Sequence, residues 1–186
     1  MIEVLSDILT SFGLSASAGL NAYLPLLIVA LVARFSDLIR LNQPFDALTS
    51  GWVIAILAVL TLIELLVDKI PAVDTINDII QTAVRPAAGA ILFAASSNAI
   101  TDIHPVLAVI CGILVAGAVH TVKATTRPLV TATTAGTANP IVSAVEDIVS
   151  GVLSLLSILV PLLAFLLILI GVWLIFRSLH RSRAYV

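Results

Sequence analysis

The strongest constraint on this chain is an apolar run near its C-terminal end, where residues 151–176 contain no charged side chain. About 20 mostly apolar residues are enough for a helix to cross the hydrocarbon core of a bilayer. The whole chain has the same character, because 60% of its residues are hydrophobic and only 11% are charged, against about 25% charged in soluble domains. We therefore predict an integral membrane protein, with 186 residues forming a single all-helical, polytopic bundle.

The composition also excludes several partners and kinds of site. A formal net charge of −2 and the lack of a long basic tract exclude a nucleic-acid partner. The single cysteine, Cys111, lies in an apolar run, so we expect no disulfide framework and no cysteine-based metal site. The sequence contains no nucleophile elbow, no phosphate loop and no His-Cys metal spacing. We therefore expect neither an enzyme nor an organic cofactor.

The apolar runs predict how the chain crosses the bilayer. Five candidate spans are residues 13–33, 51–67, 86–100, 105–122 and 151–176. If the polar stretch 128–148 is a sixth crossing, seven basic residues (Lys69, Arg85, Lys123, Arg127, Arg177, Arg181 and Arg183) fall on one side and two (Arg34 and Arg40) on the other. Cytoplasmic loops are enriched in Lys and Arg, so this pattern favours six crossings with both termini in the cytoplasm.

Three segments lie outside these predicted spans. Residues 1–12 lack the basic start of a cleaved signal peptide and are predicted to form an amphipathic lead-in. Residues 68–85 are predicted to be an amphipathic, acidic cytoplasmic segment, and residues 177–186 a basic cytoplasmic tail.

The stretch TATTAGTANP (residues 131–140) is polar for a membrane segment and predicts a broken helix. Pro140 cannot donate a hydrogen bond to the carbonyl of Gly136, and that carbonyl is flanked by Thr134 and Asn139. Non-helical backbone is tolerated at membrane depth only where protein buries it or where it lines a cavity.

A second break is predicted in SASAGLNAYLP, where Pro25 leaves the carbonyl of Asn21 without its helical donor. Paired broken helices form the substrate sites of many transporters. The alternative is that small residues and tolerated prolines serve only close helix packing.

Acidic residues gather at the end of the second span. Glu64 and Asp68 are four residues apart and share a helix face, with Glu64 one turn inside the apolar run. A carboxylate within the membrane is expensive and indicates a functional site with a basic partner. The candidate partners are Arg85 and the Lys123–Arg127 loop. Together Glu64 and Asp68 are also candidate ligands for a divalent cation.

Arg85 and Arg127 belong to a second tier of candidates. The other four members of that tier are acids, namely Asp74, Asp78, Glu146 and Asp147. Each has a structural alternative. The first two fit the wet face of an interfacial helix, and the last two fit a solvated helix end.

Small residues recur every four positions in the fourth span, at Ala108, Gly112 and Ala116, with His120 completing the series. Such a seam is typical of helix–helix contact and leaves open a homodimer.

Three separated motifs resemble one known family: GLNAYLPLL, ELLVDKIPAVDTINDIIQTAVRPAAGAI and ANPIVSAVEDIVS. They occur in order over most of the chain and are similar to a bacterial integral-membrane family described as a domain of unknown function (DUF4126). The resemblance implies a multi-pass protein of the bacterial inner membrane and implies no activity.

The leading functional hypothesis is a small transporter or permeation protein for a cation, with proton coupling left open. Its predicted ion-binding residues are Asn21, Glu64, Asp68, Thr134, Gly136 and Asn139. The alternative is a non-transporting membrane scaffold or lipid-interacting protein, whose acids would form a cytoplasmic docking surface.

Overall fold

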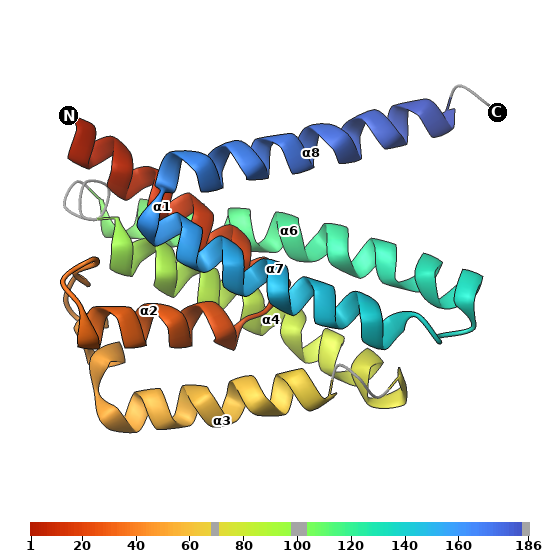
Figure 1. Cartoon of the computed structure of the whole chain (residues 1–186), viewed down its shortest axis with the longest axis horizontal. Coiled ribbons are helices and arrows are strands. Elements are labelled where there is room, and N and C mark those ends of the chain that lie inside the picture. Colours follow the sequence, from red (N-terminus) through yellow and green to blue (C-terminus); the bar gives the residue numbers. More distant parts are fainter. Residues whose placement is uncertain (68–70, 98–103, 184–186) are drawn as a thin grey trace.

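The computed structural model of the chain describes residues 1–67, 71–97 and 104–183, without the side chains of residues 71–76, 78, 175–176 and 178–183. Regular structure in this part is entirely helical, which confirms the all-helical prediction (Figure 1). The elements are α1 (Ile2–Leu20), α2 (Tyr23–Phe35), the 3₁₀ helix η1 (Phe45–Thr49), α3 (Gly51–Val67), α4 (Pro71–Ser96), α6 (Pro105–Thr134), α7 (Asn139–Leu159) and α8 (Pro161–Arg183).

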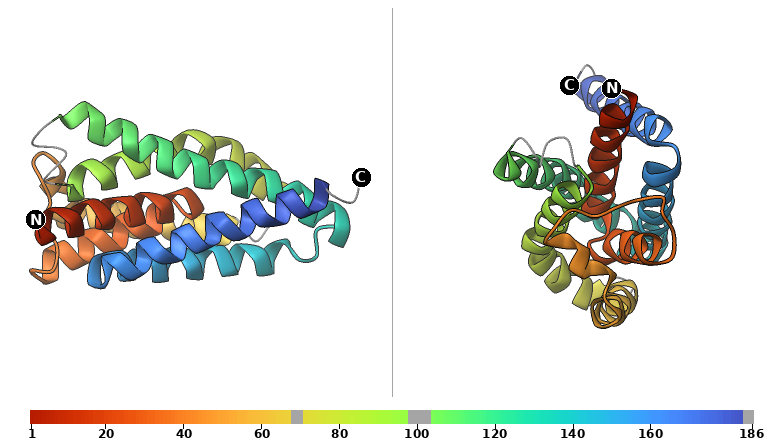
Figure 2. Two further views of the ribbon diagram at one scale, coloured as in Figure 1. Left: turned by 90° about the horizontal axis from the view of Figure 1, so that it is seen from above. Right: turned by 90° about the vertical axis from the view of Figure 1, so that its left-hand side faces the viewer.

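The first two helices form a hairpin that enters the bundle from one end and returns to the same end (Figures 1 and 2). Helices α4, α6 and α7 continue past the tip of this hairpin, which lies in the interior of the bundle. The hairpin packs closely against all three, since α1 contacts α4, α6 and α7, and α2 contacts α3 and α7. The predicted single span over residues 13–33 is therefore wrong.

The polarity of the bundle is that of a membrane protein. Large apolar side chains face outward on α3, where Leu62 and Leu66 are 57% and 56% exposed, whereas Glu64 between them is 1% exposed. Three of the described helices have the length and hydropathy to cross a bilayer, over Ile79–Ser96, Pro105–Thr134 and Asn139–Leu159. Shorter apolar helices are Tyr23–Phe35, Gly51–Val67 and Pro161–Leu174. The outer surface is thus suited to lipid and the interior to polar contacts.

Helices α1 and α2 are separated at Asn21 and Ala22, and local chemistry explains the separation. Asn21 is extended, with φ −140° and ψ 129°, and its side-chain Oδ1 accepts a hydrogen bond of 2.9 Å from the backbone N–H of Leu24. This contact satisfies one of the free N–H groups at the start of α2. Pro25 lies in the first turn of α2, where a missing N–H costs nothing.

The predicted break over residues 131–140 is a turn between two helices, not an interruption inside a span. Helix α6 continues through Pro128 to Thr134, and α7 starts at Asn139. Ala135 and Gly136 connect them with φ values of 51° and 80°. The turn lies at one end of the bundle (Figure 1), so the span predicted over 128–148 is divided between α6 and α7.

Three other sequence predictions need correction. The apolar run 151–176, predicted as one span, is divided between α7, which ends at Leu159, and α8, which begins at Pro161. Residues 71–96 form one helix, α4, with Pro86 inside it, so the predicted interfacial segment 68–85 and span 86–100 share a helix. The start of α1 and the end of α8 lie at opposite ends of the bundle (Figures 1 and 2), where six crossings would have put both termini on one side. The difference arises because the α1–α2 hairpin turns back instead of crossing.

The small-residue seam is confirmed as a contact between helices inside the chain. Ala108, Gly112, Ala116 and His120 are all buried on α6. A Cβ on Gly112 would clash with the backbone of Gly89 and Ala90 on α4, so the two helices approach as closely as their backbones allow. Because α4 covers this seam, it is not a surface for a second copy of the chain.

Candidate functional site

Charged and polar side chains converge on the tip of the α1–α2 hairpin. They come from four other helices: α3, α4, α6 and α7. We call this set the tip network, and it consists of Leu20, Asn21, Ala22, Tyr23, Glu64, Thr82, Arg85, His120, Lys123, Arg127, Ser143, Glu146 and Asp147.

Glu64 lies at the N-terminal end of α2. Its Oε1 and Oε2 accept hydrogen bonds of 3.4 Å from the backbone N–H groups of Ala22 and Tyr23, respectively. The N-terminus of a helix carries partial positive charge and free N–H donors, so a carboxylate is favoured there. Oε1 also pairs with Arg85 at 3.4 Å, and both side chains are fully buried, at 1% and 0% exposure.

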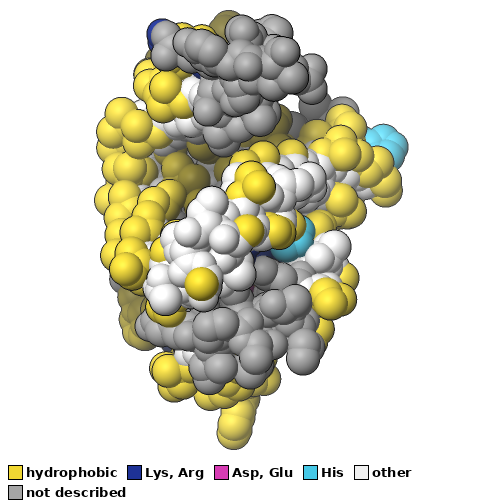
Figure 3. Space-filling model, turned by 90° about the vertical axis from the view of Figure 1, so that its right-hand side faces the viewer, with side chains coloured by type: hydrophobic (Ala, Val, Ile, Leu, Met, Phe, Trp, Pro, Cys, Tyr) yellow, Lys and Arg dark blue, Asp and Glu magenta, His cyan; other side chains and the backbone are white. Residues whose placement is uncertain are grey.

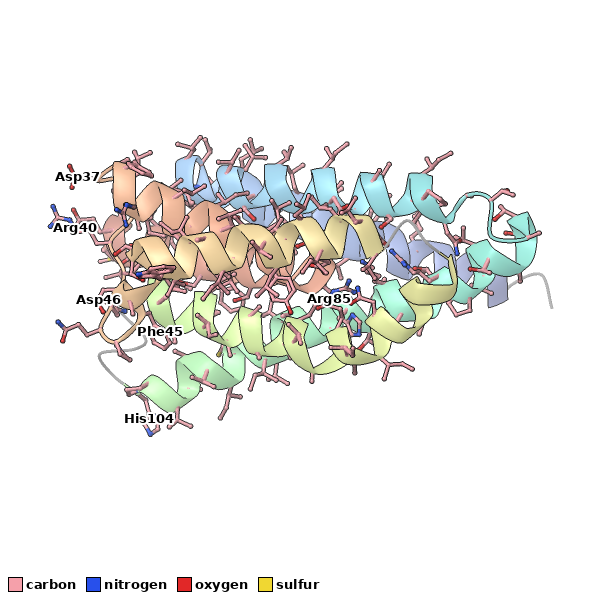
Figure 4. All side chains as sticks on the ribbon, turned by 90° about the horizontal axis from the view of Figure 1, so that it is seen from below. Asp37, Arg40, Phe45, Asp46, Arg85 and His104 are labelled. Atoms are coloured by element: carbon pink, nitrogen blue, oxygen red, sulfur yellow. The ribbon has the colours of Figure 1, made fainter. Side chains whose placement is uncertain are left out.

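Arg85 connects Glu64 to α6. Its Nη1 lies 3.0 Å from Nδ1 of His120, whose Nε2 lies 3.1 Å from the hydroxyl of Thr82. Arg85 is seen within the bundle, away from the end where Asp37, Arg40, Asp46 and His104 lie (Figure 4). The guanidinium therefore has a carboxylate and an imidazole as partners in the same buried site.

Lys123 binds the other helix end at the hairpin tip, which is the C-terminal end of α1. Its Nζ donates a hydrogen bond of 2.9 Å to the carbonyl of Leu20, the last residue of α1, and lies 2.9 Å from Oε2 of Glu146. A cation is favoured at the C-terminal end of a helix. Gly19 permits this approach, because a Cβ there would lie 2.6 Å from the backbone oxygen of Ala116 on α6.

Arg127 lies one turn beyond Lys123 on α6 and binds the same acid. Its Nη2 donates to Oε2 of Glu146 at 3.0 Å and to the hydroxyl of Ser143 at 3.3 Å. Two cationic side chains thus share one carboxylate oxygen of Glu146.

Asn21 links the tip to α7, because its Nδ2 donates a hydrogen bond of 2.9 Å to Oδ1 of Asp147. Further along α7, the hydroxyl of Ser150 donates to the carbonyl of Ser17, and that of Ser154 donates to the hydroxyl of Ser17, both at 2.9 Å. These serines are fully buried. The hairpin is therefore held to α7 by hydrogen bonds along its length.

The charges of the tip network balance when histidine is neutral. Three carboxylates (Glu64, Glu146 and Asp147) accompany three cations (Arg85, Lys123 and Arg127). Removing one partner of a buried ion pair leaves an uncompensated charge at a cost of about 3–5 kcal/mol. The network is consequently sensitive to any change in protonation or to any added ion.

The structure separates the predicted site residues into three groups. It brings Asn21 and Glu64 together at the hairpin tip, with Arg85, Arg127, Glu146 and Asp147 of the second tier. Thr134, Gly136 and Asn139 form the α6–α7 turn instead, where Asn139 bonds Thr131. Asp68 and the side chains of Asp74 and Asp78 lie outside the described residues.

Sequence reasoning missed the serines of α7 and the contact between Lys123 and α1. A signal for the serines exists, because Ser143, Asp147, Ser150, Ser154 and Ser157 recur every three or four residues in an otherwise apolar helix. The contact made by Lys123 depends on the hairpin and has no local signature.

No group of three or more His, Cys, Asp or Glu side chains that could hold a metal occurs among the described residues. At the end of the bundle that carries the α6–α7 turn, the visible described surface is mainly apolar or uncharged polar, and no described acid appears on it (Figure 3). In the tip network, Glu64 and Glu146 bind basic side chains, Glu64 also accepts from backbone N–H groups, and Asp147 accepts from the amide of Asn21.

Comparisons with known proteins give a family and no activity. No curated protein and no solved structure matches the chain significantly. One family model, described as a domain of unknown function (DUF4126), matches residues 8–181. This match covers most of the hairpin, the whole tip network and most of α8, so the chain, an all-helical membrane protein, belongs to the DUF4126 family.

Proposed function

We propose that this protein is a small membrane transporter in which the α1–α2 break is the solute-binding centre and Glu64 carries a coupling proton. The observation that carries the proposal is the position of Glu64, buried between the N-terminal end of α2 and Arg85. Transporters commonly place the ends of discontinuous helices near the bilayer midplane to bind solutes and coupling ions.

A proton fits this centre better than a metal ion. A metal would have to displace Arg85 or Lys123, whose charges already balance those of Glu64 and Glu146. A proton neutralises Glu64 without needing room for a larger ion. The cation favoured by the sequence is therefore assigned here as a proton.

In the proposed transporter, Arg85 is the side chain that has two arrangements. Protonation of Glu64 removes the charge that attracts the guanidinium, while the contact of 3.0 Å with His120 is unaffected. The N-terminal end of α2 then loses its carboxylate partner. The hairpin tip is still held by the hydrogen bond from Lys123 to Leu20 and by the one from Asn21 to Asp147. A change in the population of these two arrangements is what a coupled transporter requires.

A buried oxygen next to Arg85 supports a polar occupant. Gln81 lies one turn before Arg85 on α4 and is 1% exposed, and its Oε1 has no hydrogen-bond partner among the described residues. A buried acceptor without a partner costs about 1–3 kcal/mol. A solute or water that donates to Gln81 would remove this cost.

The test is the thermal stability of the purified protein in detergent over a range of pH and a panel of cations. The parent is compared with Glu64→Gln and with Glu3→Gln, a matched change at an exposed acid. We expect the melting midpoint of the parent and of Glu3→Gln to depend on pH, and Glu64→Gln to lose part of that dependence. Parallel curves for all three proteins would contradict proton binding at Glu64. A rise specific to one metal cation and lost in Glu64→Gln would replace the proton with that cation.

A second candidate is a non-transporting scaffold or lipid-interacting protein. It is favoured by the internal pairing of five charges, as in a static core: Glu64 pairs with Arg85, and Glu146 pairs with Lys123 and Arg127. Cysteine accessibility separates the two functions, with Ala22→Cys at the tip and Thr137→Cys at the exposed turn, both in a Cys111→Ala background. Reaction of both with a water-soluble thiol reagent supports a hydrated centre. Reaction of Thr137→Cys alone supports the scaffold.

A further inference from the structure

An apolar groove opens on the lipid-facing side of the bundle between α1, α6, α7 and α8. Every residue that lines it is Ala, Gly, Val, Leu or Ile. Its volume of about 620 Å³ is within the range of about 300–1,000 Å³ that is typical of ligand pockets. A groove of this composition takes a hydrocarbon and gives a water-soluble solute nothing to bind.

One end of this groove lies next to the tip network, with which it shares Leu20. Leu20 lines the groove, and its carbonyl accepts the hydrogen bond from Lys123. Val119 lines it one turn before Lys123 on α6. Ile148 lines it on α7 directly after Asp147. The apolar groove and the tip network are therefore adjacent parts of one region.

We infer that the solute of the proposed transporter is a phospholipid, with one hydrocarbon chain in the groove and its phosphate head at the tip network. This inference rests on the proposed function and names its substrate class. The surrounding side chains face the bilayer, since Leu155, Leu166 and Ile170 are 44%, 46% and 53% exposed. Lipid chains are the medium at this depth, so they have direct access to the groove.

The basic residues at the end of the groove fit a phosphate group. Lys123 and Arg127 follow Val119 at intervals of four residues on α6, so all three lie along one face. Both cations bind Oε2 of Glu146, at 2.9 and 3.0 Å. A phosphate oxygen has the same hydrogen-bonding chemistry as this carboxylate oxygen and would exchange with it.

Gly171 allows the groove to be filled without damage to the fold. A Cβ at this position would meet no atom within 4 Å, so Gly171→Phe places a ring in open space. Ile170→Phe is the matched control, because Ile170 is the preceding residue of α8, is exposed to lipid and does not line the groove.

The experiment uses proteoliposomes of phosphatidylethanolamine and phosphatidylglycerol with a trace of phosphatidylglycerol that carries a diazirine on one acyl chain. After irradiation, adducts are mapped by peptide mass spectrometry. We expect them to concentrate on the groove-lining parts of α7 and α8. Gly171→Phe should reduce this labelling by about tenfold or more, the discrimination seen when a pocket changes by a methylene or more. Ile170→Phe should leave it unchanged.

A diacylglycerol with the same diazirine tests the head group, because it lacks the phosphate. The parent should prefer the phosphatidylglycerol probe, and Lys123→Gln should lose that preference while keeping acyl-chain adducts in the groove. Equal labelling of the parent by both probes would contradict a phosphate site. Adducts spread evenly over the lipid-facing helices would contradict an acyl-chain site in the groove. Cross-links showing that a second copy of the protein covers the groove would contradict it as well.

The two proposals fail separately. If Glu64→Gln keeps the full pH dependence of the parent while the groove is labelled as expected, proton coupling is wrong and lipid binding stands. If Glu64→Gln loses that dependence while Gly171→Phe leaves labelling unchanged, the transporter stands and its solute is not a phospholipid.

Discussion

The ammonium of Lys123 lies 2.9 Å from the carbonyl oxygen of Leu20, where α1 ends inside the bundle. Helix α2 begins three residues later, and the carboxylate of Glu64 accepts from the backbone N–H groups of its N-cap Ala22 and its first residue Tyr23. The two half-helix ends are thus each matched by a side chain of opposite charge from a helix that passes them. This double match explains how a chain break is tolerated within a membrane bundle.

The Glu64–Arg85 pair should behave as a coupled unit in stability measurements. We expect Arg85→Met to lower the free energy of unfolding by about 3 kcal/mol or more, because it leaves Glu64 charged and buried. The double variant Glu64→Gln with Arg85→Met should be more stable than Arg85→Met alone, since it removes both charges. The free energies of unfolding of the parent, the two single variants and the double variant, measured in detergent, give the coupling between the two side chains. Additive effects of the two changes would show that the two side chains do not interact.

The contact between α4 and α6 predicts opposite effects for two glycines of α6. Gly112→Ala puts a Cβ 2.6 Å from the Cα of Ala90, and we expect it to destabilise the protein by about 1–3 kcal/mol. Gly117→Ala meets nothing closer than 3.9 Å, so it should be neutral or stabilise the helix by up to about 1 kcal/mol. Melting midpoints of the two variants in one detergent compare them directly. Equal midpoints would mean that α4 and α6 are farther apart than described.

The turn between α6 and α7 gives a second pair of matched changes. Ala135 has a φ of 51°, so Ala135→Gly should raise the free energy of unfolding by about 1 kcal/mol by relieving left-handed strain. Gly136 has a φ of 80°, and Gly136→Ala should lower the free energy of unfolding by about 1–2 kcal/mol. The same unfolding assay in detergent measures the stability of both variants. A loss of stability in Ala135→Gly would indicate a different backbone at this turn.

Much of this architecture was predictable because it depends on local chemistry. An isolated acid in an apolar run indicates a buried functional group, and Glu64 is buried against Arg85, one of the partners considered from sequence. The break near Asn21 followed from Pro25, which cannot complete the helix before it. Span 51–67 agrees with α3 because its apolar run begins and ends abruptly.

The errors arose where distant contacts decide the structure. Residues 13–33 have the length of a span, but the break at Asn21 lets α2 fold back along the bundle, where its N-terminal end meets Glu64. The polar stretch 131–140 was predicted inside the membrane from charge counting, yet a hairpin at the bundle end needs the same turn-forming residues. Pairing of Lys123 with Leu20 joins residues far apart in sequence, so local pattern could not indicate it.

Infrared difference spectroscopy between high and low pH tests the central claim, that Glu64 binds and releases a proton within the folded protein. The stretch of a protonated carboxyl group should appear on acidification in the parent and in Glu3→Gln, and a component of it should be missing in Glu64→Gln. A spectrum of Glu64→Gln identical to that of the parent would show that Glu64 stays in its ion pair with Arg85. Proton coupling through this residue would then be wrong.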